Sequence, residues 1–136
     1  MAGYYDPLYT SPYEEYVARL RDKGIVSYIT DYMSYRRMVM GEERVVALYT
    51  TPTCTACMVY KPIFYSVAEE FARKGGEPRF IEVDAYMVPE AAFEVGVMAT
   101  PTTVFFVRGR RVDAIVGVID DEELKRMVSE LLHKKN

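Results

Sequence analysis

Apolar side chains recur along this chain at two spacings, and these spacings predict an alternation of helices and strands. Between Ser11 and Gly24 they lie three or four residues apart, as on one face of a helix, at Tyr13, Tyr16, Val17 and Leu20. Ser11, Pro12 and Glu14 are typical of a helix start, with a capping serine, a proline in the first helical position and a glutamate in the capping-box position. Gly24 supplies a stop signal, and residues 1–10 are expected to form an irregular arm.

A continuous apolar run from Arg44 to Thr50 has the pattern of a strand that is buried on both faces of a mostly parallel sheet. The remaining pattern predicts, in chain order, a strand at 25–29, a helix at 31–40, a long helix ending near 74, a strand at 79–84, a short helix at 89–95, a hairpin of strands at 102–107 and 111–116, and a helix at 120–133. Strands that alternate with helices predict an α/β fold, a three-layer sandwich around a central mixed sheet of about five strands. An N-terminal arm and extra helix (residues 1–24) precede the main domain (residues 25–136).

Composition and charge exclude several classes of function. The chain has 136 residues, half of them apolar, but no apolar run approaches the roughly 18–20 residues that a membrane span needs. The N-terminus, Met1 to Pro7, lacks the basic start and the apolar stretch of a signal peptide, so we expect a cytoplasmic protein. A net charge of -3 with mixed signs offers no attraction to nucleic acid or to an anionic membrane.

Amide side chains are almost missing from the chain: there is no glutamine, and the one asparagine is Asn136. Depletion of thermolabile amides is one mark of thermophile proteins, and it indicates a heat-adapted source such as an archaeon. Genome base composition would give the same bias, so both explanations stay open.

The two cysteines of the chain stand together as Cys54-Thr55-Ala56-Cys57, after the apolar strand and at the expected start of the long helix. A helix N-terminus has unpaired N–H groups and a partial positive charge, which favour a thiolate over a thiol. The alternatives are a structural disulfide and half of a metal site. A zinc site needs about four protein ligands, whereas the chain has no third cysteine and its one histidine, His133, lies near the C-terminus. In a cytoplasmic protein the pattern therefore favours redox chemistry.

We expect Cys54 to be the nucleophile, because the first cysteine lies at the exposed end of the helix, where the dipole acts most strongly. Its thiolate would attack a substrate disulfide and form a mixed disulfide. Cys57, one helical turn further on and more buried, would resolve that intermediate and leave a Cys54–Cys57 disulfide. A merely structural bridge remains the alternative.

Further residues at fixed distances from the cysteines give the chain a resemblance to the thioredoxin family. Pro62 stands where that family has a proline five residues after the second cysteine, and Ala99-Thr100-Pro101-Thr102 stands where it has an X-Pro-Thr with a cis peptide bond. Gly109, Gly117 and Asp84 match the family's hairpin glycine, its glycine near the end of the last strand and its third-strand aspartate.

The resemblance covers roughly residues 25–133 and implies a thioredoxin-like fold, a cis bond before Pro101 and substrate docking around the cysteines. An extended substrate would pair with the Thr100 backbone as an added strand. The implied docking residues are Thr53, Thr55, Ala56, Thr100, Pro101 and Gly117. The implied activity is a protein-disulfide reductase without a cofactor or metal of its own. Since the chain has no nucleotide-binding glycine motif, an external reductase would recycle it.

The chain departs from the family pattern at the cysteines and behind them. Thr53-Cys54-Thr55-Ala56-Cys57 replaces the usual Trp-Cys-Gly-Pro-Cys. Leu48 stands six residues before Cys54, where thioredoxins carry a buried aspartate taken as the base for the second thiol, and Phe80 replaces a lysine of many members. We therefore expect a drier and less charged site than in the family, with a water molecule or Asp84 as candidate bases.

Other functions stay open at this point. Thr55-Ala56 between the cysteines does not fix the reduction potential, so a glutaredoxin-like or isomerase-like oxidoreductase is one alternative. A non-enzymatic binding module, or a dimer that bridges an iron–sulfur cluster through the C-x-x-C, is another. The large aromatic residues are assigned to core packing and three methionines to filling gaps: Tyr49, Tyr60, Phe64, Phe71, Phe93, Phe105 and Phe106, with Met58, Met87 and Met98.

Overall fold

The computed structural model of the chain describes residues 11–135, so the arm expected at residues 1–10 and the terminal Asn136 lie outside the described residues. Helix α1 (Pro12–Asp22) begins as its sequence predicts. The Ser11 side chain accepts a hydrogen bond from the Glu14 backbone N–H, and the Glu14 carboxylate accepts one from the Ser11 N–H. The local capping signal therefore places the start of this helix.

Five strands form one sheet in the order β1-β3-β2-β4-β5. Their bounds are β1 (Val26–Ile29), β2 (Arg44–Thr50), β3 (Arg79–Asp84), β4 (Thr102–Val107) and β5 (Arg110–Val116). β1, β3 and β2 run parallel, whereas β4 is antiparallel to both β2 and β5. β2 is central, which explains why every residue of it after Arg44 is buried. The predicted mixed sheet is confirmed.

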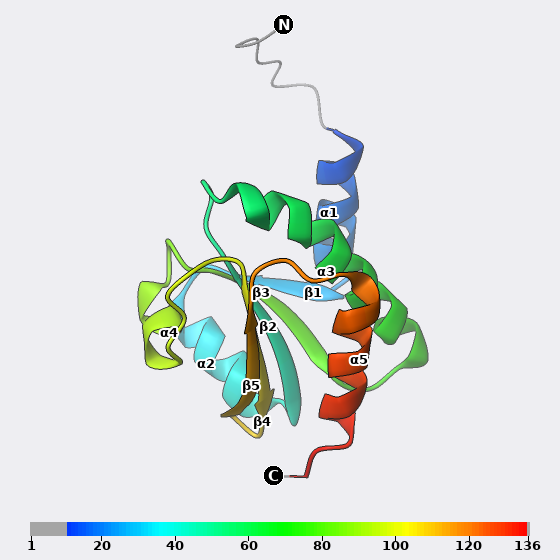
Figure 1. Cartoon of the computed structure of the whole chain (residues 1–136), viewed down its shortest axis with the longest axis vertical. Helices are drawn as coiled ribbons and strands as arrows, with labels where there is room; N and C mark the ends of the chain where they lie inside the picture. The colour runs from blue at the N-terminus through cyan, green and yellow to red at the C-terminus, as the bar shows by residue number, and fades with distance from the viewer. Residues whose placement is uncertain (1–10, 136) are drawn as a thin grey trace, which may run out of the picture.

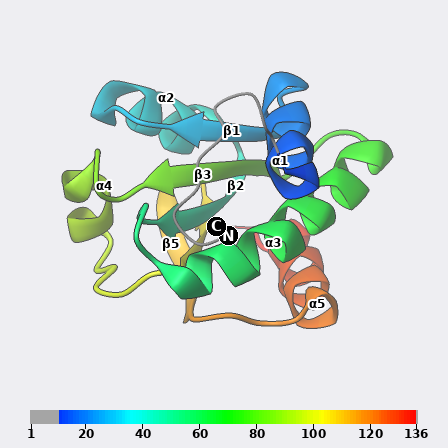
Figure 2. The ribbon, with the colours of Figure 1, turned by 90° about the horizontal axis from the view of Figure 1, so that it is seen from above.

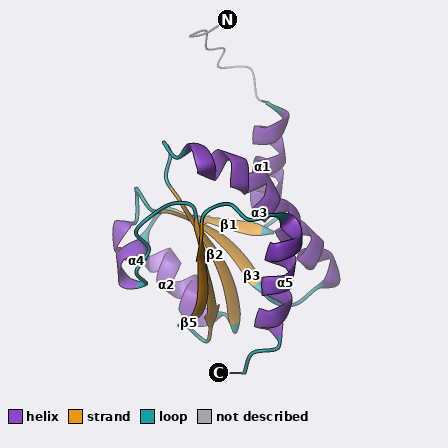
Figure 3. Ribbon diagram, viewed as in Figure 1, coloured by secondary structure: helices purple, strands orange, loops and turns teal. Residues whose placement is uncertain are grey.

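Helices cover both faces of this sheet and complete the predicted three-layer sandwich (Figures 1 and 3). Helices α1, α3 (Thr55–Lys74) and α5 (Asp121–Leu132) lie on one face, and α2 (Tyr32–Gly41) and α4 (Pro89–Glu94) on the other, as Figure 2 shows from above. The extra helix α1 packs on α3 and β1. Helix α3 continues through Pro62 instead of ending there.

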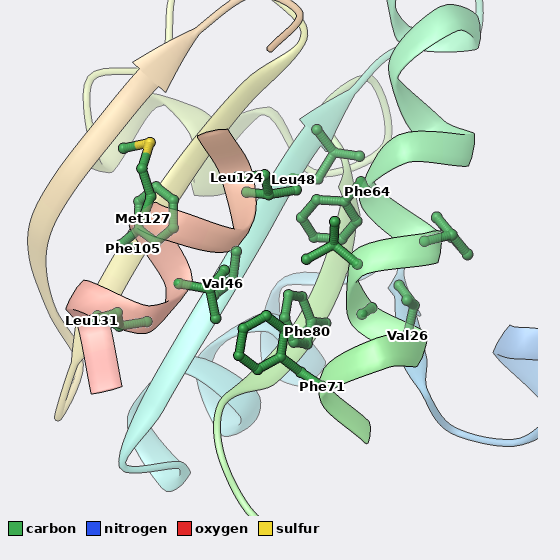
Figure 4. Packing of buried hydrophobic residues seen from close by; sticks show 14 of the residues in the cluster. Val26, Val46, Leu48, Phe64, Phe71, Phe80, Phe105, Leu124, Met127 and Leu131 are labelled. Atoms are coloured by element: carbon green, nitrogen blue, oxygen red, sulfur yellow. The ribbon is translucent and has the colours of Figure 1, made fainter. Parts of the chain in front are cut away.

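The larger apolar core lies between the sheet and helices α1, α3 and α5. Figure 4 shows Phe64 and Phe71 of α3 against Phe80 of β3, with Leu48 of β2 close by. The ring centroids of Phe64 and Phe80 lie 5.7 Å apart in an edge-to-face arrangement. This packing fixes α3, and therefore the cysteines at its start, against the sheet.

The aromatic residues expected in the core are buried with one exception, because Phe93 is 86% exposed. Helix α4 has only six residues, and it turns Ala91 and Ala92, together with the preceding Val88, toward the sheet. Phe93 follows on the opposite side of the helix, where no described element covers it. The assignment of Phe93 to the core is therefore wrong.

Candidate active site

The two cysteines occupy the first turn of α3, at the carboxyl end of the central strand β2. Cys54 is the N-cap of the helix, and its Sγ accepts a hydrogen bond from the Cys57 backbone N–H at 3.1 Å. A disulfide joins the two residues. Cys54 is half-buried and Cys57 is 1% exposed. The first sulfur is thus the accessible one, and after reduction the helix N-terminus stabilises a thiolate there.

A second segment meets Cys54 across 46 residues of chain. The Thr100–Pro101 peptide bond is cis, as the resemblance implied, and the Thr100 carbonyl oxygen lies 3.4 Å from Cys54 Sγ. The Gly117 N–H donates a hydrogen bond to the Pro101 carbonyl at 2.8 Å. Gly117 has a φ of 95°, a conformation that side-chain-bearing residues rarely adopt, so a glycine is needed here. The structure therefore brings Thr100, Pro101 and Gly117 to the dithiol.

The remaining predicted docking residues form the turn that carries the cysteines. Thr53, Thr55 and Ala56 are exposed, whereas Thr100 is half-buried and Pro101 is buried. None of these side chains is ionisable, so the surface around Cys54 is small and mildly apolar, as expected from the sequence.

An apolar groove of about 470 Å³ continues this surface toward α4. Its lining includes Thr100 from the cis turn, Ala92 and Phe93 from α4, and Met98 from the loop between them. Met98 is 95% exposed, so its assignment as a gap-filler is wrong, and Met58 and Met87 are also more than half exposed. The helical spacing of Val88, Ala91 and Ala92 was the signal that could have placed Phe93 on the outer side.

Behind the dithiol the structure contains a buried carboxylate that sequence reasoning missed. Glu82 of β3 is 0% exposed and lies beside Leu48 in the register of β2 and β3. Its oxygens accept hydrogen bonds from Thr50 Oγ1 and from the Tyr65 hydroxyl, both at 2.6 Å. Arg21 Nη2 and Lys61 Nζ form ion pairs with it at 2.9 and 3.1 Å. The signal was a glutamate inside the apolar strand Arg79–Asp84.

Charge behind the dithiol is thus supplied by Glu82 and not by the positions of Leu48 and Phe80, which are buried in the apolar core. The candidate base Asp84 is engaged elsewhere. It accepts hydrogen bonds from the Tyr28 hydroxyl at 2.8 Å and from the backbone N–H groups of Tyr86 and Met87 at 3.0 and 3.1 Å. These bonds tie Asp84 to β1 and to the turn after β3.

Glu82 remains ionised despite its burial. Burial alone would raise its pKa, but the Lys61 charge, the hydrogen bonds from Thr50 and Tyr65, and Arg21 together hold the pKa below its usual value. A carboxyl whose pKa is lower in the folded than in the unfolded state stabilises the fold above the unfolded pKa. That contribution is lost as the pH falls through the folded value.

We expect Glu82→Gln to lower the free energy of unfolding by about 2–4 kcal/mol at pH 7, because it leaves Arg21 and Lys61 without their counter-ion. The difference from the native chain should shrink as the pH falls below about 4.5, where the unfolded carboxyl is protonated. Urea unfolding between pH 3 and pH 7 measures the loss of stability at pH 7 and its decrease at low pH. Glu130→Gln, which changes an exposed carboxylate of α5, is the control. A gap that stays constant down to pH 3 would contradict the assignment of charge to Glu82.

Within residues 11–135, no group of three or more His, Cys, Asp or Glu side chains is arranged to hold a metal ion. His133 is exposed at the end of α5, and its Nδ1 lies 2.8 Å from the Ser129 carbonyl oxygen. None of the described helices has the length and apolarity to cross a bilayer.

Comparison with known proteins gives a consistent result. The Thioredoxin family model matches residues 13–130. A thioredoxin of Malassezia sympodialis is 30% identical over 105 residues, which cover 77% of this chain and 97% of that protein. A stretch of the NADPH-dependent thioredoxin reductase 3 of Arabidopsis thaliana is 32% identical over 94 residues, covering 68% of this chain and 17% of that protein. Among solved structures, a mutant thioredoxin from Halobacterium salinarum superposes with a TM-score of 0.70 at 21% identity, covering 82% of this chain and 94% of that one.

Proposed function

Because the chain belongs to the thioredoxin family and is a thiol-disulfide oxidoreductase, we propose that it reduces protein disulfides with Cys54 as nucleophile and Cys57 as resolving thiol. One observation carries this assignment: Cys54 is only half-buried at the N-terminus of a 20-residue helix, whereas Cys57 is 1% exposed. The accessible sulfur is the one that a second protein can reach.

The reaction takes two exchange steps. The Cys54 thiolate attacks one sulfur of the substrate disulfide, a mixed disulfide forms, and the other substrate sulfur leaves as a thiolate that takes up a proton. Cys57 then loses its proton and attacks Cys54 Sγ, which forms the Cys54–Cys57 disulfide and releases the second substrate thiol. The N-cap position lowers the cost of negative charge on Cys54 in the reduced protein.

Docking of the substrate is proposed to use the backbone and the apolar surface around Cys54. An extended segment would lie along Thr100, whose carbonyl is already within 3.4 Å of the sulfur, and would add a short strand beside the cis turn. The contacting residues would be Thr53, Thr55, Ala56, Thr100, Pro101 and Gly117. The absence of charge among these side chains suits substrates whose disulfides are flanked by small or apolar residues.

The groove between Met98 and Phe93 is proposed to receive an apolar side chain of the substrate. We expect Phe93→Ala combined with Met98→Ala to lower kcat/KM for a protein disulfide by about tenfold, since burying one large apolar side chain contributes about 1.5–3 kcal/mol. Reduction of the small disulfide of oxidised glutathione should change less than twofold. Met33→Ala removes a similarly exposed methionine from α2 and is the control. An equal loss on both substrates would point to a damaged dithiol instead of a lost groove.

The experiment that tests the function is reduction of insulin disulfides with dithiothreitol as electron donor. Turbidity should appear faster with the protein than without it, and the protein should be colourless and free of metal. A reduction potential near that of glutaredoxins or of protein disulfide isomerase would favour those activities instead. Brown protein with bound iron, together with inactivity on insulin, would favour a cluster-bridging module.

The electron donor, the cellular location and the source are proposed on narrower grounds. A relative that carries a similar stretch is named as an NADPH-dependent thioredoxin reductase, which supports a reductase of that class as the partner. We propose a cytoplasmic setting, and a heat-adapted source rests on the missing amides. The thermal unfolding midpoint is the measurement that decides the heat adaptation.

A further inference from the structure

Three charged side chains from three separate elements meet behind the dithiol, and the proposed chemistry does not use them. Arg21 comes from α1, Lys61 from α3 and Glu82 from β3. Both cations contact the same carboxylate, Arg21 at 2.9 Å on one oxygen and Lys61 at 3.1 Å on the other. The side chains of Arg21, Lys61 and Glu82 are 29%, 19% and 0% exposed respectively. We call these three residues the charge cluster.

The charge cluster is fixed to both arms of the dithiol turn. Thr50, the last residue of β2 before that turn, donates its hydroxyl hydrogen bond to Glu82. Lys61 follows Cys57 by four residues and Cys54 by seven, so all three lie on one stripe of α3. At 1.5 Å per residue, the Lys61 Cα is about 6 Å further along the axis than that of Cys57. Its Cβ also tilts toward the helix N-terminus. The charge cluster is therefore joined, through Thr50 and Lys61, to the two segments that hold the sulfurs.

The cluster carries a net positive charge at neutral pH: two cations and one carboxylate leave one positive charge. Tyr65 stays neutral, because burial and the nearby Glu82 raise its pKa well above the ordinary value. Tyr13 and Tyr28 face the same carboxylate and stay neutral too, with the pKa of Tyr28 raised to about 12 by burial and Asp84. Asp84, hydrogen-bonded to Tyr28, and Glu14, which lines the same hollow as Arg21 and Lys61, are further charged neighbours.

We propose that the charge cluster sets the reduction potential of the Cys54–Cys57 couple, and that Arg21 makes the extra helix α1 part of that device. The inference rests on the proposed dithiol function. Reduction of the disulfide creates a thiolate at the start of α3, and a net positive charge nearby stabilises that reduced form. Burial keeps the interaction strong, since screening by water is weak there. Burying ions costs free energy, and a role in tuning the dithiol is a reason for the cluster to be kept.

If the charge cluster sets the reduction potential, loss of its carboxylate and loss of one of its cations should shift the dithiol–disulfide equilibrium in opposite directions. Glu82→Gln raises the net charge by one and should favour the dithiol. Arg21→Met and Lys61→Met lower it by one and should favour the disulfide. A merely structural cluster would respond to all three losses in the same direction.

The test is equilibration of the purified full chain with glutathione at pH 8. One Cys54–Cys57 disulfide and two glutathione thiols give one dithiol and one glutathione disulfide. We expect the equilibrium constant to rise about tenfold in Glu82→Gln and to fall about tenfold in Lys61→Met, each corresponding to about 30 mV. Arg21→Met should lower the constant by about threefold, because Arg21 is more exposed than Lys61 and belongs to α1, not to the helix that carries the cysteines.

Matched controls separate charge from packing. Lys61→Arg keeps the cation and should restore the native constant. Arg19→Met removes a cation of α1 whose guanidinium lies over the Tyr16 ring. Lys74→Met removes a cation at the far end of α3. Both variants should leave the equilibrium constant unchanged. If Glu82→Gln does not fold, Arg21→Met and Lys61→Met alone test the proposal. Constants within twofold of native in both would overturn the proposal, even where the native chain reduces insulin. A native chain inactive on insulin would overturn the proposed function instead.

Discussion

Cys54→Ser is expected to abolish insulin reduction, with a loss on the order of 10³-fold or more, because no second nucleophile is accessible at this site among the described residues. Cys57 cannot substitute for it, since that sulfur is 1% exposed behind the helix turn. Cys57→Ser keeps the attacking thiolate but removes the group that resolves the intermediate. Each substrate encounter should then end as a stable mixed disulfide through Cys54.

Trapping is measured by incubating each variant with a disulfide-containing protein and separating the products under non-reducing conditions, with mass spectrometry to identify the joined cysteine. The matched comparison is between the two single variants, which carry the same chemical change three residues apart. Equal trapping by Cys54→Ser would contradict the assigned roles. Trapping by neither variant would favour a structural disulfide.

The second large effect concerns stability. Phe64→Ala is expected to lower the free energy of unfolding by about 3–5 kcal/mol, because it removes a fully buried ring and leaves a cavity. Phe64 is 0% exposed and packs on Tyr60, Tyr65 and Phe80. Its helix also carries the cysteines, so activity should fall at temperatures where the variant begins to unfold.

Phe93→Ala provides the matched control, since the same ring is deleted from an 86% exposed position. Its free energy of unfolding should stay within about 0.5 kcal/mol of the native value. Urea unfolding of the two variants at pH 7 measures the difference. Similar losses at both positions would mean that Phe93 packs against the fold, contrary to the exposure described above.

Much of the architecture could be predicted from local signals in the sequence. The capping residues around Ser11, the buried run of β2 and the cysteine pair at the start of α3 each depend on neighbours within a few positions. Such patterns survive in any tertiary context that forms the same elements. Pro101 is different, because a cis bond is rare for an X-Pro in general. It was expected only through the resemblance to thioredoxins.

Errors arose where a side chain's environment depends on distant elements. Phe93 was assigned to the core and Met98 to filling a gap, but Phe93 lies on the outer side of the short helix α4 and Met98 in the loop after it, both exposed. Glu82 was given no role from the sequence, although it lies inside the strand predicted at 79–84. Its role became visible only when Arg21, 61 residues earlier in the chain, and Lys61 met it in space.

The sequence by itself therefore determined the order of helices and strands, the reactive pair Cys54 and Cys57, and the family to which the chain is similar. Each of these depends on residue types at fixed spacings along the chain. Only the tertiary structure decided which apolar side chains line the groove and how a buried carboxylate is compensated. Those properties are sums over atoms from several elements. Burial and Coulomb interactions depend on distance in space, which the order of residues along the chain does not specify.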